Sequence, residues 1–203
     1  MFDVTPFRGL VFDMDGTLVE SGPLHEIAWR ETLSKYNLPI DARLMHSLAG
    51  VPTKETLLRV AAETGLPLSA PVEEMNAFKE ALVADMAPRY VKATRLADLA
   101  RQHYGSLPMA VGTGAYTAEA REILKHCGIL SLFDIVVGAD QVAHPKPAAD
   151  TFLACARHLG CLPEECVVFE DADLGLEAAR AAGMTAVDVR TEFQFINDYF
   201  LNG

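Results

Sequence analysis

Two aspartates separated by one residue, Asp13 and Asp15, end a short apolar run and come directly before Gly16. While the chain stays extended, side chains two positions apart project in the same direction, so both carboxylates are offered to one place. Gly16 then allows the backbone to turn sharply. Taken alone, this stretch is explained equally well as a simple Asp-Gly turn.

Other short apolar runs also end in polar residues. Thr113 has a glycine on each side, where a hydroxyl and small neighbours could approach an oxyanion closely. Lys146 stands between two prolines, which stiffen its loop and aim its ammonium group. Glu170 and Asp171 are adjacent acids at the end of a further run. Each has an ordinary alternative: a glycine-rich turn, a surface lysine, or the N-cap of the next helix.

Together, these residues supply the parts of a site for a hard cation and a phosphate. Carboxylate oxygens suit Mg²⁺, which typically keeps several waters and takes phosphate oxygens as further ligands. A hydroxyl and an ammonium group suit the remaining oxygens of a phosphate. Four chain segments that all carry such groups are far more specific than any one of them.

The elements that must position these residues form an α/β pattern. Ligands of open α/β sheets bind outside the carboxyl ends of the strands, which is where these residues stand. Apolar runs predict strands at Arg8–Asp13, Met109–Gly112, Ile135–Gly138, Val167–Glu170 and Thr185–Val189. Helical patterns lie between them at Thr117–Cys127, Ala148–Leu159 and Leu174–Ala182. The alternation predicts a Rossmann-like parallel sheet with helices on both faces.

The stretch after the first strand departs from this alternation. It contains no strand candidate, and its helical patterns are Pro23–Asn37, Asp41–Ala49, Thr53–Thr64 and Pro71–Met86. We therefore expect an all-helical cap domain over residues 19–90, inserted into an α/β core of residues 1–18 and 91–203. Val19–Pro23 and Met86–Arg89 are the expected hinges, and the aromatic tail Phe193–Phe200 is expected to pack on the core.

Composition excludes several classes of function. The 203 residues include 17 Lys and Arg against 28 Asp and Glu, a formal net charge of −11, which argues against nucleic-acid and membrane-surface partners. Neither a transmembrane run nor a signal-peptide pattern is expected, so a cytoplasmic setting follows. Cysteines with no metal-type spacing are expected to be reduced thiols: Cys127, Cys155, Cys161 and Cys166.

The ordered motifs resemble those of the haloacid dehalogenase-like hydrolase superfamily, in the β-phosphoglucomutase-like subfamily with a helical cap after the first strand. Phe12–Val19 resembles its first motif, Thr113 its second, Lys146–Phe152 its third, and Phe169–Gly175 followed by Ala181–Met184 its fourth. The resemblance spans essentially the whole chain. Pro108–Gly114 and Cys166–Asp173 resemble the bacterial fructose-1-phosphate phosphatases in particular.

This resemblance implies a catalytic role for each aspartate of the first motif. Asp13 would attack phosphorus and form an aspartyl-phosphate. Asp15 would protonate the leaving alkoxide and then deprotonate the hydrolytic water. Mg²⁺ would be held by Asp13, the backbone carbonyl of Asp15, Glu170 and Asp171. The second aspartate and the acid pair favour phosphoryl transfer over attack on a carbon–halogen bond.

The resemblance also implies that Thr113 and Lys146 hold the transferring oxygens. His25 stands where related sugar-phosphate enzymes carry a histidine that controls acid–base readiness, but an ordinary exposed helix histidine is an equal alternative. Lys79 could reach the site from the cap, although a solvated lysine is the simpler expectation. The expected substrate-binding residues are Gly16, Gly114, His25, Gly50 and Lys79.

The predicted function is a Mg²⁺-dependent phosphatase of a small sugar phosphate, with fructose 1-phosphate as the leading candidate. A β-phosphoglucomutase is the alternative, but the cap-loop lysine and arginine of such mutases are replaced here by Ala49 and Thr53. Hydrolysis of phosphoglycolate, nucleotides or 2-deoxyglucose 6-phosphate stays open, as does a phosphosugar-binding module without turnover. No organic cofactor is expected, and the chain is expected to be a monomer or weak homodimer.

Overall fold

A five-stranded parallel sheet lies at the centre of the fold, in the strand order β5-β4-β1-β6-β7. The computed structural model describes residues 2–201, so residues 1, 202 and 203 of the expected core lie outside the described residues. All five expected strands are present, with ends that differ by one residue at most. They are β1 (Gly9–Phe12), β4 (Met109–Gly112), β5 (Ile135–Val137), β6 (Cys166–Glu170) and β7 (Thr185–Asp188).

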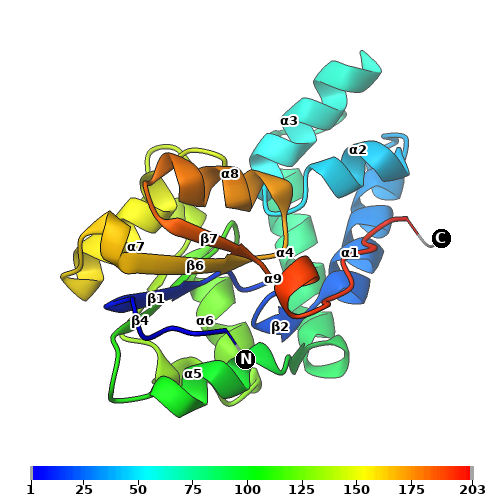
Figure 1. Cartoon of the computed structure of the whole chain (residues 1–203). Coiled ribbons are helices and arrows are strands. Elements are labelled where there is room, and N and C mark those ends of the chain that lie inside the picture. Colours follow the sequence, from blue (N-terminus) through cyan, green and yellow to red (C-terminus); the bar gives the residue numbers. More distant parts are fainter. Residues whose placement is uncertain (1, 202–203) are drawn as a thin grey trace.

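Helices cover both faces of the sheet, as expected (Figure 1). On one face, Val11 packs with Phe152 of α7 and Ala178 of α8. On the other, Leu10 and Phe12 pack with apolar residues of α5 and α6. The bounds of these helices are α5 (Leu96–His103), α6 (Thr117–His126), α7 (Asp150–Leu159) and α8 (Asp173–Ala181). Three short 3₁₀ turns are η1 (Leu130–Leu132), η2 (Ala139–Gln141) and η3 (Pro163–Glu165).

Four helices, which we call the helical insertion, separate β1 from the rest of the sheet and lie at one end of it in Figure 1. All four correspond to helices expected from the sequence. They bury an apolar cluster of their own, which includes Trp29, Leu33, Met45, Leu57 and Met75. Their bounds are α1 (Gly22–Lys35), α2 (Ala42–Ser47), α3 (Thr53–Thr64) and α4 (Val72–Tyr90).

The expected hinge at Met86–Arg89 lies inside a helix, because α4 continues through Pro88 to Tyr90. Burial of Val83 and Ala87 in the main core holds this last part of the helix in place. The two chain segments that connect the sheet to the insertion pair as a short antiparallel ribbon, β2 (Val19–Glu20) with β3 (Lys92–Ala93). Strands of two residues are too short to leave a pattern in the sequence.

The C-terminal tail packs on the core only in part. It begins with α9 (Val189–Glu192), after which Phe193 and Phe195 lie against the main core, as expected. Phe200 is instead buried in the apolar cluster of the helical insertion. The tail therefore joins the two parts of the molecule. The sequence patterns do not predict α5, which lies between β3 and β4.

The cysteines are free thiols, as expected. Burial raises the pKa of Cys155 and of Cys166 to about 12, so both thiols stay protonated near neutral pH. Across residues 2–201, no helix combines the length and the apolar character that a membrane span requires.

Candidate active site

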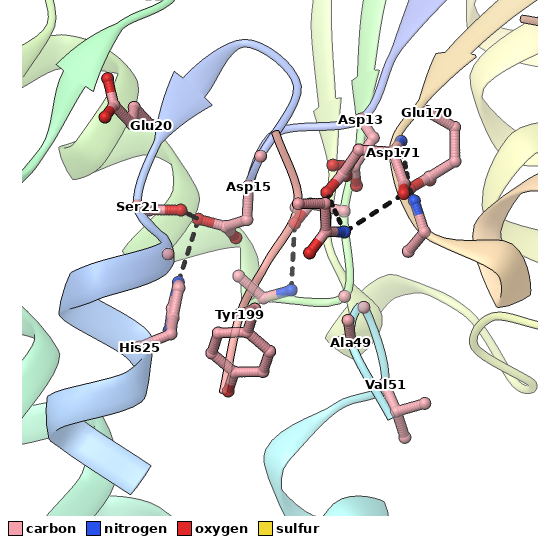
Figure 2. A pocket seen from close by; sticks show the side chains of 18 of the residues that line it. Asp13, Asp15, Glu20, Ser21, His25, Ala49, Val51, Glu170, Asp171 and Tyr199 are labelled. Atoms are coloured by element: carbon pink, nitrogen blue, oxygen red, sulfur yellow. Dashed lines mark hydrogen bonds and ion pairs between the residues drawn. The ribbon is translucent and has the colours of Figure 1, made fainter. Parts of the chain in front are cut away.

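A cavity of about 770 Å³ opens at the carboxyl ends of the strands, beside the helical insertion (Figure 2). Its walls come from the loops after β1, β4 and β6, from α1, α4 and α6, from the loop between α2 and α3, and from the tail. All of the predicted site residues except Lys146 line it: Asp13, Asp15, Gly16, His25, Gly50, Lys79, Thr113, Gly114, Glu170 and Asp171.

Lys146 lies directly behind this wall, between two carboxylates. Its Nζ atom is 2.6 Å from Oδ1 of Asp13 and 2.7 Å from Oε2 of Glu170, and its side chain is 1% exposed. The other oxygen of Glu170 accepts the backbone N–H groups of Asp171 and Ala172 at 3.1 and 3.0 Å. The ammonium group is therefore fixed in direction by the two ion pairs, whereas a surface lysine would be free to move.

Asp171 completes a group of three buried carboxylates. One oxygen from each of Asp13, Glu170 and Asp171 lies within 4.8 Å of the others. The Thr17 hydroxyl donates to Oδ1 of Asp171 at 3.2 Å and fixes its orientation. Clustered carboxylate oxygens are the donor set of a hard cation, so these residues fit Mg²⁺. The side chain of Asp15 lies outside this group.

The negative charge of these three carboxylates favours the binding of a further cation. Burial raises the pKa of Asp13 to about 8, and Glu170 adds to this shift, while Lys146 opposes it. Burial and then the charges of Glu170 and Asp13 raise the pKa of Asp171 well above its usual range. The two carboxylates that flank Lys146 raise its pKa in spite of burial. Three carboxylates thus share one ammonium group, and a divalent cation would relieve their mutual repulsion.

Asp15 belongs to a separate chain of hydrogen bonds. Its Oδ1 accepts the Ser21 hydroxyl at 2.6 Å and lies 3.0 Å from Nε2 of His25 (Figure 2). The Nζ atom of Lys79 lies 3.4 Å from Nδ1 of His25. Burial raises the pKa of Asp15, but the charge of His25 and the hydrogen bonds from His25 and Ser21 lower it overall.

Two alternatives considered for the helical insertion are therefore wrong. His25 is not an ordinary exposed helix histidine, because its side chain is only 14% exposed and bonds to Asp15. Lys79 is not solvated, because it is 6% exposed and lies against His25 and over the ring of Trp29. Helical periodicity did not reveal this burial, since it depends on how α1 and α4 pack against each other.

Glycines let the loops around the cavity approach one another. A Cβ atom at Gly114 would lie 2.2 Å from the carbonyl oxygen of Gly50, so the insertion meets the core at this point. Gly16 has a φ of +78°, and a Cβ there would lie 2.2 Å from Oδ2 of Asp171. Thr113 is buried beside Gly114, and its hydroxyl oxygen accepts the N–H of Ala115 at 3.1 Å.

Several residues of the cavity were missed in the sequence. Asn76, one turn before Lys79 on α4, and Glu119, in the first turn of α6, each have a buried side-chain oxygen. Neither Oδ1 of Asn76 nor Oε1 of Glu119 has a hydrogen-bond partner among residues 2–201. The spacing of Asn76 and Lys79 could have indicated that Asn76 faces the cavity, because residues three apart share a helix face. Ser21, Thr17 and the tail residues carried no such signal.

Comparisons with known proteins agree with this arrangement. Residues 7–183 match the family model of the haloacid dehalogenase-like hydrolases. The chain is 44% identical over 187 residues to the fructose-1-phosphate phosphatase of Escherichia coli (strain K12), covering 91% of this chain and 97% of that protein. It is 27% identical over 192 residues to the beta-phosphoglucomutase of Bacillus subtilis, covering 90% and 83%. A hydrolase from Pseudomonas syringae has a similar structure, with a TM-score of 0.81, 26% identity, and coverage of 89% of this chain and 84% of that one.

Proposed function

Since the chain belongs to the haloacid dehalogenase-like hydrolase family, we propose that it is a phosphatase that hydrolyses a small phosphorylated sugar, with fructose 1-phosphate as the first candidate. The observation that carries this proposal is the contrast between two aspartates of one motif. Asp13 lies among carboxylates, and its Oδ1 is 2.6 Å from Nζ of Lys146. Asp15 is held apart by hydrogen bonds with His25 and Ser21. Two carboxylates in such different surroundings suit two different roles.

In the proposed reaction, Asp13 is the nucleophile. Its carboxylate attacks phosphorus, the bond from phosphorus to the ester oxygen breaks, and Asp15 gives its proton to the leaving alkoxide. Water then attacks the aspartyl-phosphate, and Asp15 takes up the proton of that water while phosphate leaves Asp13.

The transferring oxygens need positive charge and hydrogen-bond donors around them. We propose that Lys146 and the Thr113 hydroxyl provide these, because Nζ of Lys146 lies 2.6 Å from Asp13 and Thr113 follows β4 in the wall of the same cavity. Asp13, Glu170, Asp171 and the backbone carbonyl of Asp15 would hold Mg²⁺. The bound cation would offset the charge of the carboxylates and of the phosphate oxygens.

Another part of the cavity wall suits a polyol. Oδ1 of Asn76 and Oε1 of Glu119 are buried acceptors with no partner among the described residues, and sugar hydroxyls can donate to both. The ring of Trp29 adds an apolar surface beside them. We propose that residues 19–90 act as a cap domain that selects the substrate. The identity to the fructose-1-phosphate phosphatase of Escherichia coli supports a ketohexose phosphate as that substrate.

A phosphosugar mutase is the second candidate, which the similarity to a beta-phosphoglucomutase supports. Ala49 and Thr53 line the cavity on the insertion side, where a bisphosphate intermediate would need cationic side chains. We therefore rank phosphate release above isomerisation.

The decisive experiment measures phosphate release from hexose 1- and 6-phosphates, phosphoglycolate and nucleotides, with and without Mg²⁺. We expect the highest kcat/KM with fructose 1-phosphate, no release without Mg²⁺, and none from Asp13→Asn. Thermal unfolding of Asp13→Asn is the folding control. Phosphate release by that variant above contamination would overturn the proposed nucleophile. Isomerised sugar phosphate in excess of free phosphate, with a bisphosphate primer, would favour the mutase.

A further inference from the structure

The C-terminal segment, defined here as residues 193–200, lies beyond the part of the chain that matches the family model. The family match ends at residue 183, yet residues 194–199 line the cavity. In Figure 2 the pale red ribbon of this segment runs past Asp15 to Tyr199. The segment therefore forms a wall of the candidate active site that is additional to the four motifs.

Within this segment, Asn197 bonds directly to the carboxylate cluster. Its Nδ2 atom donates to Oδ2 of Asp171 at 2.7 Å and lies 3.2 Å from the backbone carbonyl oxygen of the same residue. Thr17 donates to the other carboxylate oxygen, Oδ1. A carboxylate has about four lone-pair positions, so one donor on each oxygen leaves each oxygen able to bind a cation. Asn197 and Thr17 thus hold Asp171 from two sides without using up its capacity as a ligand.

Contacts with the sheet side of the molecule hold one end of the segment. The ring of Phe193 lies edge-on to that of Phe169, with the ring centroids 6.1 Å apart. The guanidinium group of Arg95 lies 5.3 Å from the ring centroid of Phe195, at cation–π distance. These contacts fix the segment just before Asn197.

The helical insertion holds the other end. Phe200 is 1% exposed within the insertion cluster, and the Arg30 guanidinium lies 5.1 Å from its ring centroid. Nδ1 of His46 lies 2.9 Å from the carbonyl oxygen of Tyr199. These contacts fix the segment just after Asn197.

The backbone turns sharply on both sides of Asn197. Gln194 has a φ of +54° and Phe200 a φ of +65°, in the left-handed region that side chains other than glycine rarely adopt. Such conformations persist only where the surrounding contacts determine them. The aromatic anchors at both ends supply those contacts, so the path past Asp171 is a fixed feature of the fold.

We propose that Asn197 is a positioning residue for the metal site: it orients the carboxylate of Asp171 for Mg²⁺, and the anchored C-terminal segment holds it there. The inference rests on the proposed function, because it takes Asp171 as a ligand of the cation. It adds a residue from outside the family motifs to the machinery of that site.

The test measures Mg²⁺ binding to the full-length protein by isothermal titration calorimetry, with no substrate present. Asn197→Leu keeps the size of the side chain and removes the donor, and we expect its Kd for Mg²⁺ to rise about 10-fold, as is typical when a partner of a metal ligand is lost. Leu201→Ala is the matched control, because this nearby side chain is 49% exposed and is not part of the cavity wall. Its Kd should equal that of the wild type.

A second variant ends after Glu192 and removes the whole segment. We expect its Kd for Mg²⁺ to rise at least as much, and circular dichroism and thermal unfolding show whether each variant is folded. A Kd of Asn197→Leu within twofold of the wild type, or tighter than it, would overturn the inference. Phosphate release by the wild type, measured separately, distinguishes this failure from a failure of the proposed function. If the wild type releases phosphate but binds no Mg²⁺, the metal assignment itself is wrong, and the role of Asn197 fails with it.

Discussion

Oδ1 of Asp15 lies 3.0 Å from Nε2 of His25, so a carboxylate after the first strand of the sheet is held by the first helix of the insertion. This bond makes the position of Asp15, the proposed acid–base group, depend on the position of the insertion. The adjacent contact of His25 with Lys79 extends the dependence to α4. The proposed acid–base chemistry and the proposed selection of substrate by the insertion would therefore be linked through one imidazole ring.

Replacing this histidine should affect turnover more than binding. In His25→Ala, Asp15 loses a hydrogen-bond donor that lowers its pKa and fixes its position. We expect kcat to fall about 100-fold, the size of effect that a misplaced catalytic group produces, with a smaller change in KM. Steady-state kinetics with the best sugar phosphate measures this. His158→Ala, an exposed histidine on α7, should leave both constants unchanged, and equal effects of the two variants would contradict the role of His25.

Magnesium should stabilise the folded protein in the absence of substrate. Lys146 pairs with Asp13 and Glu170, but its single positive charge does not offset three buried carboxylates, so a cation that binds only the folded state raises its stability by mass action. At a Mg²⁺ concentration of 100 times Kd the gain is about 2.7 kcal/mol. Differential scanning calorimetry measures it as a rise in Tm. Asp171→Asn should show a much smaller rise, and the same rise in both proteins would argue against binding at this cluster.

The contact between Gly114 and Gly50 predicts a substitution that impairs catalysis while the fold is retained. A methyl group at Gly114 would overlap the Gly50 carbonyl oxygen, so Gly114→Ala should push the loop between α2 and α3 away from the core. We expect kcat/KM to fall about 10- to 100-fold. Unchanged kcat/KM in Gly114→Ala would show that this approach is not needed for catalysis.

Oε1 of Glu119 has no hydrogen-bond partner within residues 2–201, which predicts a substrate-dependent effect. Glu119→Met keeps the length of the side chain and removes the oxygen that we propose accepts a sugar hydroxyl. The loss of one such bond should raise KM for the sugar phosphate about 10-fold. p-Nitrophenyl phosphate has no hydroxyl group, so its KM should stay nearly constant. A parallel rise for both substrates would point to general damage to the cavity.

Asp188 should contribute stability that depends on pH. Its carboxylate accepts hydrogen bonds from Arg190, from the backbone N–H at 2.9 Å and from the guanidinium at 2.9 and 2.8 Å. The side-chain bonds to Arg190 lower the pKa of Asp188 below its usual value. Because the folded pKa is the lower one, this stability is complete above about pH 4 and is lost as the pH falls through the folded pKa.

Urea unfolding of Asp188→Asn tests this. At pH 7 the variant should be about 1 kcal/mol less stable than the wild type, and the difference should shrink at pH 3. Asp85→Asn breaks a more exposed pair with Arg89 and should show a smaller difference at pH 7. A difference for Asp188→Asn that is the same at pH 3 and pH 7 would contradict the charge-based explanation.

The strand ends could be predicted from the sequence because their physics is local. Strands buried on both faces read as continuous apolar runs, and parallel strands bring their carboxyl ends to one edge. Asp13, Thr113 and Glu170 each follow or end such a run, so their convergence follows from the topology. The helices of the insertion could be predicted in the same way from their periodicity.

The remaining parts of the site depend on contacts between distant segments. Pro88 would ordinarily end a helix, but burial of Val83 and Ala87 keeps α4 intact around it. In the sequence, Lys79 cannot be told from a surface lysine, because its burial depends on the packing of α1 against α4. Asn197 stands in an aromatic tail with no spacing pattern, and only the complete fold brings it to Asp171.

The β2-β3 ribbon has a mechanical consequence for the insertion. Val19 pairs with Ala93 and Glu20 with Lys92, and Lys92 Nζ lies 3.0 Å from Oε2 of Glu20. The two segments that connect the sheet to the insertion are therefore tied to each other where they leave the core, so the insertion is attached by one paired ribbon and not by two separate linkers. The burial of Val83 and Ala87 in the main core and of Phe200 in the insertion cluster adds further attachments, so the orientation of the insertion is set at several points around the cavity.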